Sequence, residues 1–213
     1  MPEWFELPGW TATPDAVAWA GALLAGYLLG AIPFGLVLTR AAGIDLRQVG
    51  SGNIGATNVL RTGRRDLALA TLLLDSFKAG LAALLVGWVL GPNPGFAAGA
   101  AAFFGHCFPV WLGFRGGKGV ATYAGLLAFA TPAHGLLVGA PVWLGVFALT
   151  RISSLAALTA AVLVPPGAWL LGARPFVVAG LAGLSVLVFW THRDNLRRLL
   201  RGEEPRFGRK AGN

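Results

Sequence analysis

The chain is poor in cysteine, histidine and charged residues. Its 213 residues include one cysteine and three histidines, and only 12% of them are charged. A single cysteine, Cys107, excludes an intrachain disulfide. No group of His, Cys and carboxylate residues has the spacing of a metal site, so we expect neither a metal nor another cofactor.

Acidic residues are also scarce, nine against 17 basic ones, which gives a net charge of +8. Hydrophobic residues make up 55% of the chain and the mean hydropathy is +0.66, a composition typical of integral membrane proteins. Most cations stand in short segments between apolar runs, as expected for loops that face an anionic leaflet. We therefore expect membrane lipids as partners, with no nucleic acid and no obligate protein partner.

Seven apolar runs predict an all-α integral membrane protein, a polytopic helical bundle of seven transmembrane helices in one domain over residues 1–213. A spanning helix needs about 20 residues, so the shorter runs predict short or broken spans. Pro33 is expected to kink the first run, and GPNPG at 91–95 to form a turn. The runs cover residues 16–39, 67–90, 96–112, 120–130, 133–149, 155–171 and 176–190.

The distribution of cations predicts the orientation of the chain. With seven spans, Arg174 is the only cation in loops on the side of the N-terminus, where Glu3, Glu6 and Asp15 also lie. The positive-inside rule then puts the N-terminus outside and the C-terminus inside. The cations of the inner side are Arg40, Arg47, Arg61, Arg64, Arg65, Arg115, Lys118, Arg151 and those of the C-terminal tail.

The first polar cluster, GSGNIGATNVLR at 50–61, is dense in small hydrogen-bonding side chains. If residues 57–61 are helical, Thr57 and Arg61 share a face, and Ser51 can join them from the loop. Capping of a turn or a helix accounts for one or two of these residues, and a polar substrate site is favoured for the rest. The candidates are Ser51, Asn53, Thr57, Asn58 and Arg61.

The second cluster is GHCFPVWLGFRGGKGVAT at 105–122, named here the glycine loop. Its glycines leave backbone N–H groups uncovered, which predicts an anion-binding nest, and its two cations suit phosphate. It is not a nucleotide P-loop, because Leu112 and Gly119 stand where that motif needs a glycine and a hydroxyl. The candidate binding residues are His106, Gly113, Arg115, Gly116, Gly117, Lys118 and Gly119.

Interpretations of the same loop that involve no ligand stay open. Membrane helices use glycine for close packing, and short basic loops mark cytoplasmic helix ends. His106, at a helix end, is as compatible with a hydrogen bond to a neighbouring carbonyl as with a role in binding.

The third cluster, THRDNLRRLLRGEE at 191–204, begins where the last apolar run ends. His192 and Asn195 are three residues apart and share a face if the segment is helical. A basic amphipathic tail at the membrane interface accounts for the arginines and leucines, but not for this pair. Further up the chain, Asp75 and Lys78 are expected to face the protein interior. Ser153 and Ser154 either line the cytoplasmic cavity or cap the next helix.

These segments resemble the motifs of a known family, the bacterial acyl-phosphate:glycerol-3-phosphate acyltransferases. SGNIGATNVLR, GHCFPVWLGFRGGKGVAT and THRDNLRRLLRGEE are similar to its three motifs, and AIPFG, LLLDSFKAG and TRISS to the flanking stretches. The resemblance implies transfer of a fatty acyl group from fatty acyl phosphate to the sn-1 hydroxyl of glycerol-3-phosphate, in phospholipid synthesis. It also implies an active site on the cytoplasmic side of the bacterial inner membrane.

The resemblance implies roles for particular residues. Ser51 and Arg61 match functional residues of the family, His192 and Asn195 match its active-site pair, and Glu203 matches its structural glutamate. The glycine loop matches its glycerol-3-phosphate site. Because acyl phosphate is already activated, we expect direct attack by the hydroxyl without an acyl-enzyme. Either His192 or a substrate phosphate oxygen would take the proton.

The main alternative is a membrane transporter of phosphate or of a phosphorylated small molecule, since cations near broken helices occur in transporters too. Transport predicts polar residues at the bilayer midplane, where only Asp75 and Lys78 are expected. The H-x-x-x-x-D pair of other acyltransferases is missing, because Trp111, Gly139 and Arg197 follow the three histidines at that spacing.

Overall fold

The computed structural model describes residues 14–208, and these residues form helices and loops without a β-strand. They group into two compact units, of which the first ends at Pro132 and the second begins at Ala133. Glu3 and Glu6, on which the predicted orientation partly rests, lie outside the described residues. The assignment of the whole chain to one domain stays a prediction.

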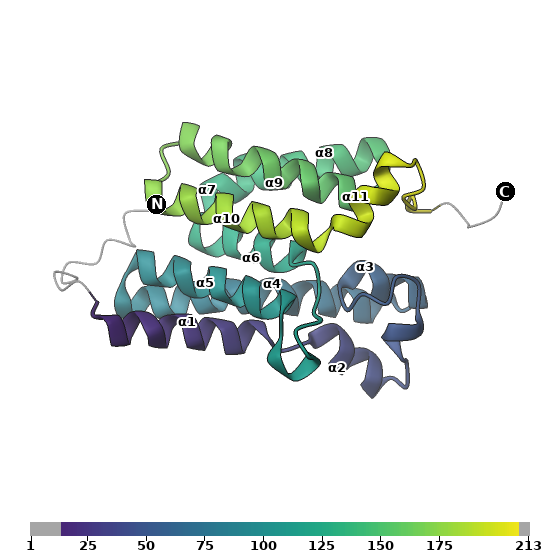
Figure 1. The fold of residues 1–213 in the computed structure, drawn as a ribbon, viewed down its shortest axis with the longest axis horizontal. Coiled ribbons are helices and arrows are strands. Elements are labelled where there is room, and N and C mark those ends of the chain that lie inside the picture. The colour runs from purple at the N-terminus through teal and green to yellow at the C-terminus, as the bar shows by residue number, and fades with distance from the viewer. Residues whose placement is uncertain (1–13, 209–213) are drawn as a thin grey trace. The chain divides into compact units, whose positions relative to one another are not determined.

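The first unit is built on three long helices that pack side by side, α1, α4 and α5 (Figure 1). α1 begins after Asp15, whose carboxylate accepts a hydrogen bond from the N–H of Ala18 at 2.8 Å, and it ends shortly before Pro33. The expected kink at Pro33 is confirmed, since the next helix starts immediately after it. The helices are α1 (Ala16–Gly30), α2 (Phe34–Ala41), α3 (Ala56–Val59), α4 (Arg65–Leu90), α5 (Pro92–Cys107) and α6 (Val120–Ala130), with 3₁₀ turns η2 (Leu46–Gln48), η3 (Leu60–Thr62) and η4 (Val110–Leu112).

Glycines bring α1 and α5 into backbone contact. A Cβ added to Gly26 would lie 2.1 Å from the carbonyl oxygen of Ala98, and one added to Gly30 would lie 2.0 Å from that of Ala102. Gly105 on α5 meets the carbonyl of Tyr27 in the same way. Small residues at such crossings let membrane helices approach closely. This contact between the two helices places the end of α5, where the glycine loop starts, against the end of α1.

The turn predicted at 91–95 is wrong beyond Gly91. α5 begins at Pro92, so Pro92–Gly95 form its first turn. Proline is tolerated there because the first N–H groups of a helix have no intrahelical acceptor. Gly91, with φ +102°, makes the whole connection between α4 and α5.

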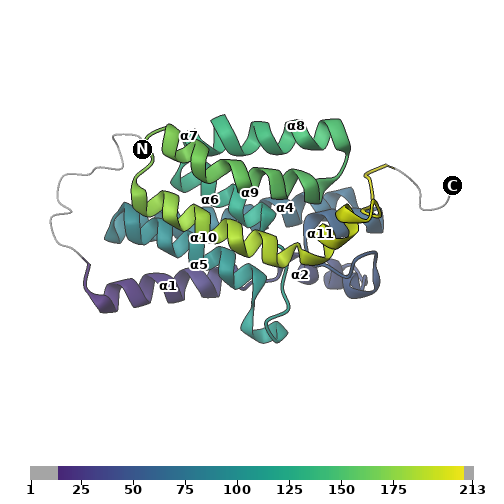
Figure 2. The same cartoon turned by 45° about the horizontal axis from the view of Figure 1, so that its top comes forward.

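The second unit contains three helices in adjacent positions, with α9 packed against both α8 and α10 (Figure 2). α10 and α11 are bent by 64° around His192, where the apolar sequence gives way to a basic one. The elements are α7 (Pro132–His134), the π-helical η5 (Gly135–Gly139), α8 (Ala140–Thr150), α9 (Ser153–Leu170), α10 (Pro175–Thr191) and α11 (Arg193–Leu200).

The helices account for every apolar run of the sequence. Among the described residues, five segments are long and apolar enough to cross a membrane, or six if the bent pair α10–α11 forms one span. α6, with 11 residues, is shorter than the thickness of a bilayer requires. The long segments are Ala16–Ala41, Arg65–Leu90, Pro92–Leu112, Pro132–Thr150 and Ser153–Leu170.

Candidate active site

Asn58 organises the first polar cluster. Its side chain is 3% exposed, and its Nδ2 lies 2.8 Å from the carbonyl oxygen of Asn53 and 2.9 Å from that of Val49. Its Oδ1 accepts from the backbone N–H of Ser51 at 3.1 Å and lies 3.4 Å from the Ser51 hydroxyl. The amide is therefore used within the loop. The substrate-binding role predicted for Asn58 stays a prediction, beside the structural role that these contacts give it.

Asn53 likewise serves the fold of the loop, because its Oδ1 accepts from the N–H of Gly55 at 3.1 Å. The other candidates of this cluster are better placed for a ligand. Arg61 and Thr57 are exposed, and the guanidinium of Arg61 lies beside the turn that carries Ser51. A Cβ added to Gly50 would lie 2.9 Å from Nη1 of Arg61. Ser51 and Arg61 are thus brought together, as predicted.

Arg47 connects the first cluster with the glycine loop. Its Nη1 donates to the carbonyl oxygen of Gly52 at 3.2 Å, and its Nη2 donates to that of Arg115 at 2.6 Å. A guanidinium can bridge two carbonyls because its donors form a rigid fork. The first polar cluster, with Ser51 and Arg61, and the glycine loop are therefore connected within the first unit.

The expected nest of glycine N–H groups is wrong for most of the loop. The N–H of Gly116 donates to the carbonyl oxygen of Cys107 and that of Gly117 to His106, both at 3.0 Å. The N–H groups of Gly113 and Arg115 also have backbone acceptors, Val110 and Leu112. The loop covers the C-terminal carbonyls of α5, which a helix end leaves without intrahelical partners.

The glycines at 117 and 119 are needed for close packing. A Cβ on Gly117 would lie 2.1 Å from Nε2 of His106, and one on Gly119 would lie 2.1 Å from the ring of Phe103. Gly119 also has φ +81°. The N–H groups suited to an anion lie just beyond, at the start of α6, where a helix has unpaired N–H donors and a positive dipole end. In the same first turn, the buried Thr122 hydroxyl has no partner among the described residues.

Asp75, Lys78 and His106 form a buried charged cluster directly beneath this loop. Lys78 Nζ lies 2.9 Å from Oδ1 of Asp75 and 2.7 Å from Nδ1 of His106. The three residues are 2%, 2% and 4% exposed. The prediction that Asp75 and Lys78 turn inward is confirmed, and His106 proves to be their neighbour.

In the second unit, His192 stands at the bend between α10 and α11 and is 2% exposed. Its Nδ1 lies 2.8 Å from the carbonyl oxygen of Val188. A carbonyl only accepts, so Nδ1 carries a proton, and in the neutral ring Nε2 carries the lone pair. This tautomer is the one that can accept a proton from a substrate through Nε2.

Glu204 ties the tail to the start of α9. Oε1 accepts from Ser154 at 2.6 Å and from Asn195 at 2.5 Å, and Oε2 accepts from Nε of Arg198 at 2.7 Å. Burial alone would raise the pKa of the Glu204 carboxyl, but these hydrogen bonds outweigh it and hold that pKa below its usual value.

Glu204 therefore makes the contacts expected of a structural glutamate. The Glu203 side chain is exposed, and these contacts do not support the structural role predicted for it. Ser154 is 4% exposed and donates to Glu204, so of the predicted serine pair only the half-buried Ser153 keeps an uncommitted hydroxyl. Within residues 14–208, no three His, Cys, Asp or Glu side chains gather closely enough to hold a metal ion.

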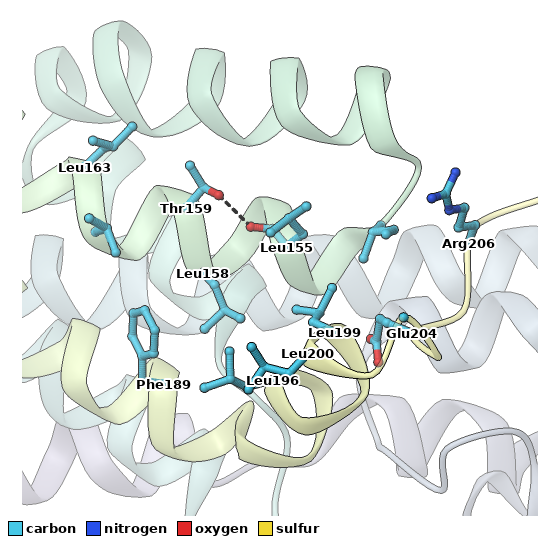
Figure 3. Close-up of a pocket in the computed structure, with 13 residues that line it drawn as sticks. Leu155, Leu158, Thr159, Leu163, Phe189, Leu196, Leu199, Leu200, Glu204 and Arg206 are labelled. Carbon is cyan, nitrogen blue, oxygen red and sulfur yellow. Dashed lines mark hydrogen bonds between the residues drawn. The ribbon is translucent and has the colours of Figure 1, made fainter.

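An apolar groove of about 670 Å³ runs along α9, α10 and α11 (Figure 3). Leucines from α9 and α11 and the ring of Phe189 line it, and Glu204 and Arg206 lie at the end next to the tail. Its lining consists of Ile152, Leu155, Leu158, Thr159, Val162, Leu163, Phe189, Leu196, Leu199, Leu200, Gly202, Glu204 and Arg206. An apolar groove with charged residues at one end suits an amphiphilic molecule.

Comparison with known proteins gives the family of this chain. The model of the family described as glycerol-3-phosphate acyltransferase matches residues 20–202. A glycerol-3-phosphate acyltransferase of Hyphomonas neptunium is 69% identical over 92% of this chain and 96% of its own length, and one of Maricaulis maris is 60% identical over 87% and 85%. The chain belongs to the glycerol-3-phosphate acyltransferase family.

Two solved structures of this acyltransferase family share the fold. Both are of PlsY (YgiH), described as an integral membrane glycerol 3-phosphate acyltransferase, one in a glycerol 3-phosphate form and one in a lysophosphatidic acid form. Their TM-scores are 0.84 and 0.83 and their identities 38% and 36%, over 89% of this chain and 96% and 95% of theirs. With its apolar helices, the chain is a multi-pass membrane protein.

Three features of this family member escaped the sequence reasoning. Arg47 is one of several loop arginines, and nothing local distinguishes the one that bridges two loops. Glu204 stands next to an identical residue. The link from Lys78 to His106 joins residues on different helices, although a histidine at a helix end and a lysine in an apolar run were each conspicuous.

Proposed function

We propose that this protein transfers a fatty acyl group from acyl phosphate to the sn-1 hydroxyl of glycerol-3-phosphate, yielding lysophosphatidic acid and inorganic phosphate in phospholipid biosynthesis. Family membership supports an acyltransferase that uses glycerol-3-phosphate. The observation that most supports a phosphate-binding surface is the bridge made by Arg47. It joins the segment bearing Ser51 and Arg61 to the loop bearing Arg115 and Lys118.

The phosphate of glycerol-3-phosphate binds at the start of α6 in this proposal. The helix N-terminus supplies N–H donors and a favourable dipole, and Lys118 and Arg115 supply positive charge. Arg61 and Ser51 contact the second anion, the acyl phosphate. Of the other predicted binding residues, Thr57 and Ser153 remain exposed or half-buried and keep that role as proposals.

The acyl transfer is direct. The sn-1 oxygen attacks the carbonyl carbon of acyl phosphate, a new C–O ester bond forms, and the C–O bond to phosphate breaks, with phosphate leaving as the inorganic ion. The hydroxyl proton goes either to His192, the predicted general base, or to a substrate phosphate oxygen. Asn195, oriented by Glu204, is the accompanying active-site residue.

The groove of the second unit accommodates the acyl chain in this proposal. Eight of its thirteen lining residues are leucine, isoleucine or valine, and its volume lies in the range of small-molecule sites.

We also propose that the chain crosses the bacterial inner membrane seven times, with α6 and the bent α10–α11 pair completing the five long spans. The N-terminus is then outside, the C-terminus inside, and the active site cytoplasmic. The positions of the cations support this orientation, since Arg174 alone stands in a loop on the other side.

The direct test is an assay of the purified protein with acyl phosphate and glycerol-3-phosphate, with acyl-CoA as the comparison donor. We expect turnover with acyl phosphate only. Arg61→Ala and Lys118→Ala should each abolish turnover without unfolding the protein, and Arg65→Ala, an exposed cation at the start of α4, should leave it unchanged. Full activity in the Arg61 or Lys118 variant, or a covalent acyl adduct on Ser51, would refute the mechanism.

Transport of a phosphorylated molecule was the competing hypothesis, and it predicted polar residues at the bilayer midplane, where only the charges of α4 were expected. These charges are saturated by partners of the same unit, since Lys78 has three acceptors for its three protons. Uptake of labelled glycerol-3-phosphate into vesicles would favour transport, and we expect none.

A further inference from the structure

Two buried charges have no part in the chemistry proposed above. Asp75 and Lys78 lie one helical turn apart on α4, and the side chains are 2% and 1% exposed. Burying two charges is costly, and their mutual attraction alone seldom repays the desolvation. Their further contact, His106, belongs to the last turn of α5 and leads directly into the glycine loop.

The protons of Lys78 determine the state of His106. Nζ lies 2.9 Å from Oδ1 of Asp75, 2.7 Å from Nδ1 of His106 and 3.1 Å from the carbonyl oxygen of Ile32. An ammonium has three donors and no acceptor, so each proton has one acceptor and Nδ1 accepts from Lys78, which is closer to it than Oδ1 of Asp75 at 3.5 Å. The single proton of the neutral imidazole is therefore on Nε2. This is the opposite tautomer to that of His192.

The Nε2 edge of the ring lies against the loop. A Cβ added to Gly117 would lie 2.1 Å from Nε2 and 2.8 Å from Cε1 of His106. The backbone of His106 holds the same glycine, because its carbonyl oxygen accepts from the N–H of Gly117 at 3.0 Å. The ring and the backbone of His106 thus both contact Gly117, and Lys118 is the next residue.

We propose that Asp75 and Lys78 are positioning residues, which fix the His106 ring beneath Gly117 and thereby set the glycine loop for the phosphate of glycerol-3-phosphate. The inference rests on the proposed function for the identity of that phosphate. Asp75 compensates the ammonium charge, Lys78 orients the ring, and the ring supports the loop. A protonated or rotated ring would meet the ammonium with an N–H, and the loop would shift.

The test uses a charge-neutral replacement, because Lys78→Met alone leaves an uncompensated buried carboxylate. Asp75→Asn with Lys78→Met keeps the volumes and removes both charges. The matched control is Thr71→Val, also buried on α4, whose hydroxyl bonds only its own helix, to Leu67. We expect the double variant to raise KM for glycerol-3-phosphate about 10- to 100-fold, with KM for acyl phosphate and kcat nearly unchanged. Equal changes for both substrates, or none, would overturn the proposal.

A second readout does not depend on the reaction. Nitrogen NMR of labelled histidine distinguishes the two tautomers, and the chain has only three histidines. We expect one Nε2–H histidine in the wild type, and we expect it to be lost as a fixed species in the double variant. A His106 signal that is unchanged in the double variant would overturn the inference even if the acyl transfer is confirmed. If the wild-type protein shows no acyl transfer but gives the expected histidine spectra, only the proposed function is refuted.

Discussion

Glu204 offers a sharp test of the tail, because an identical residue stands beside it. Glu204→Gln keeps the shape of the side chain and removes its charge. The amide oxygen can still accept from Ser154 and Asn195, but the new NH₂ group then faces the Nε donor of Arg198. Glu203→Gln is the matched control, since the Glu203 side chain is exposed.

The expected loss follows from the broken contact. A hydrogen bond that involves a charged group contributes about 1.5–3 kcal/mol, and the lower end applies because the Arg198 side chain is 37% exposed. We therefore expect Glu204→Gln to lower the free energy of unfolding by about 1.5 kcal/mol, or Tm by about 3–6 °C. Turnover should fall less than stability does, because only the contact with Arg198 is lost and Asn195 keeps its acceptor.

The pH dependence provides an independent measurement. The pKa of Glu204 is lower in the folded protein than its ordinary value of 4.5, so the folded state binds its proton less readily than the unfolded chain. Its stabilising contribution is then complete above pH 4.5 and is lost as the pH falls through the folded-state pKa. The difference in Tm between wild type and Glu204→Gln should narrow in that range. An equal loss in Glu203→Gln, or a pH-independent difference, would refute the assignment.

Two further predictions concern the first unit. Gly30→Ala should destabilise the protein by about 1–3 kcal/mol in thermal unfolding, because the new Cβ meets the backbone of Ala102, whereas Gly21→Ala, with no atom within 4 Å, should be neutral or stabilising. Asn58→Asp should lose most activity and make the loop at 50–61 more sensitive to protease, since the carbonyls of Asn53 and Val49 lose their donor. Wild-type protease resistance in this variant would count against the role of Asn58.

The helices were predictable because the membrane requires long apolar runs between breakers. α4, α6, α9 and α10 begin and end within about two residues of the limits read from the sequence, which is the usual uncertainty of helix ends. The close contact at Gly26 and Gly30 is of the small-residue kind that membrane helices use to pack. The turn at 91–95 failed because proline breaks a helix in its interior but begins one readily.

The sites were predictable in position but not in function. The polar clusters stood out against an apolar chain, yet the sequence does not show what lies next to each residue. From the sequence, Gly117 was expected to expose its backbone N–H group. In the structure, the ring of His106 lies directly against this glycine. Glu203 and Glu204 are locally equivalent, and only the contact with Ser154, 50 residues away, distinguishes them.

The same physical device recurs in each polar segment of this acyltransferase. One buried polar group holds the segment, Asn58 in the first cluster, Lys78 beneath the glycine loop and Glu204 at the tail, and each has several short contacts. In an apolar protein an unsatisfied group is expensive, so such a saturated group allows few alternative loop conformations. The proposed transfer from acyl phosphate, an activated donor, needs charges that are already in place more than it needs a nucleophile. Fixing loops through single buried residues leaves the charges of Arg61 and Arg115 for the anions of the proposed reaction.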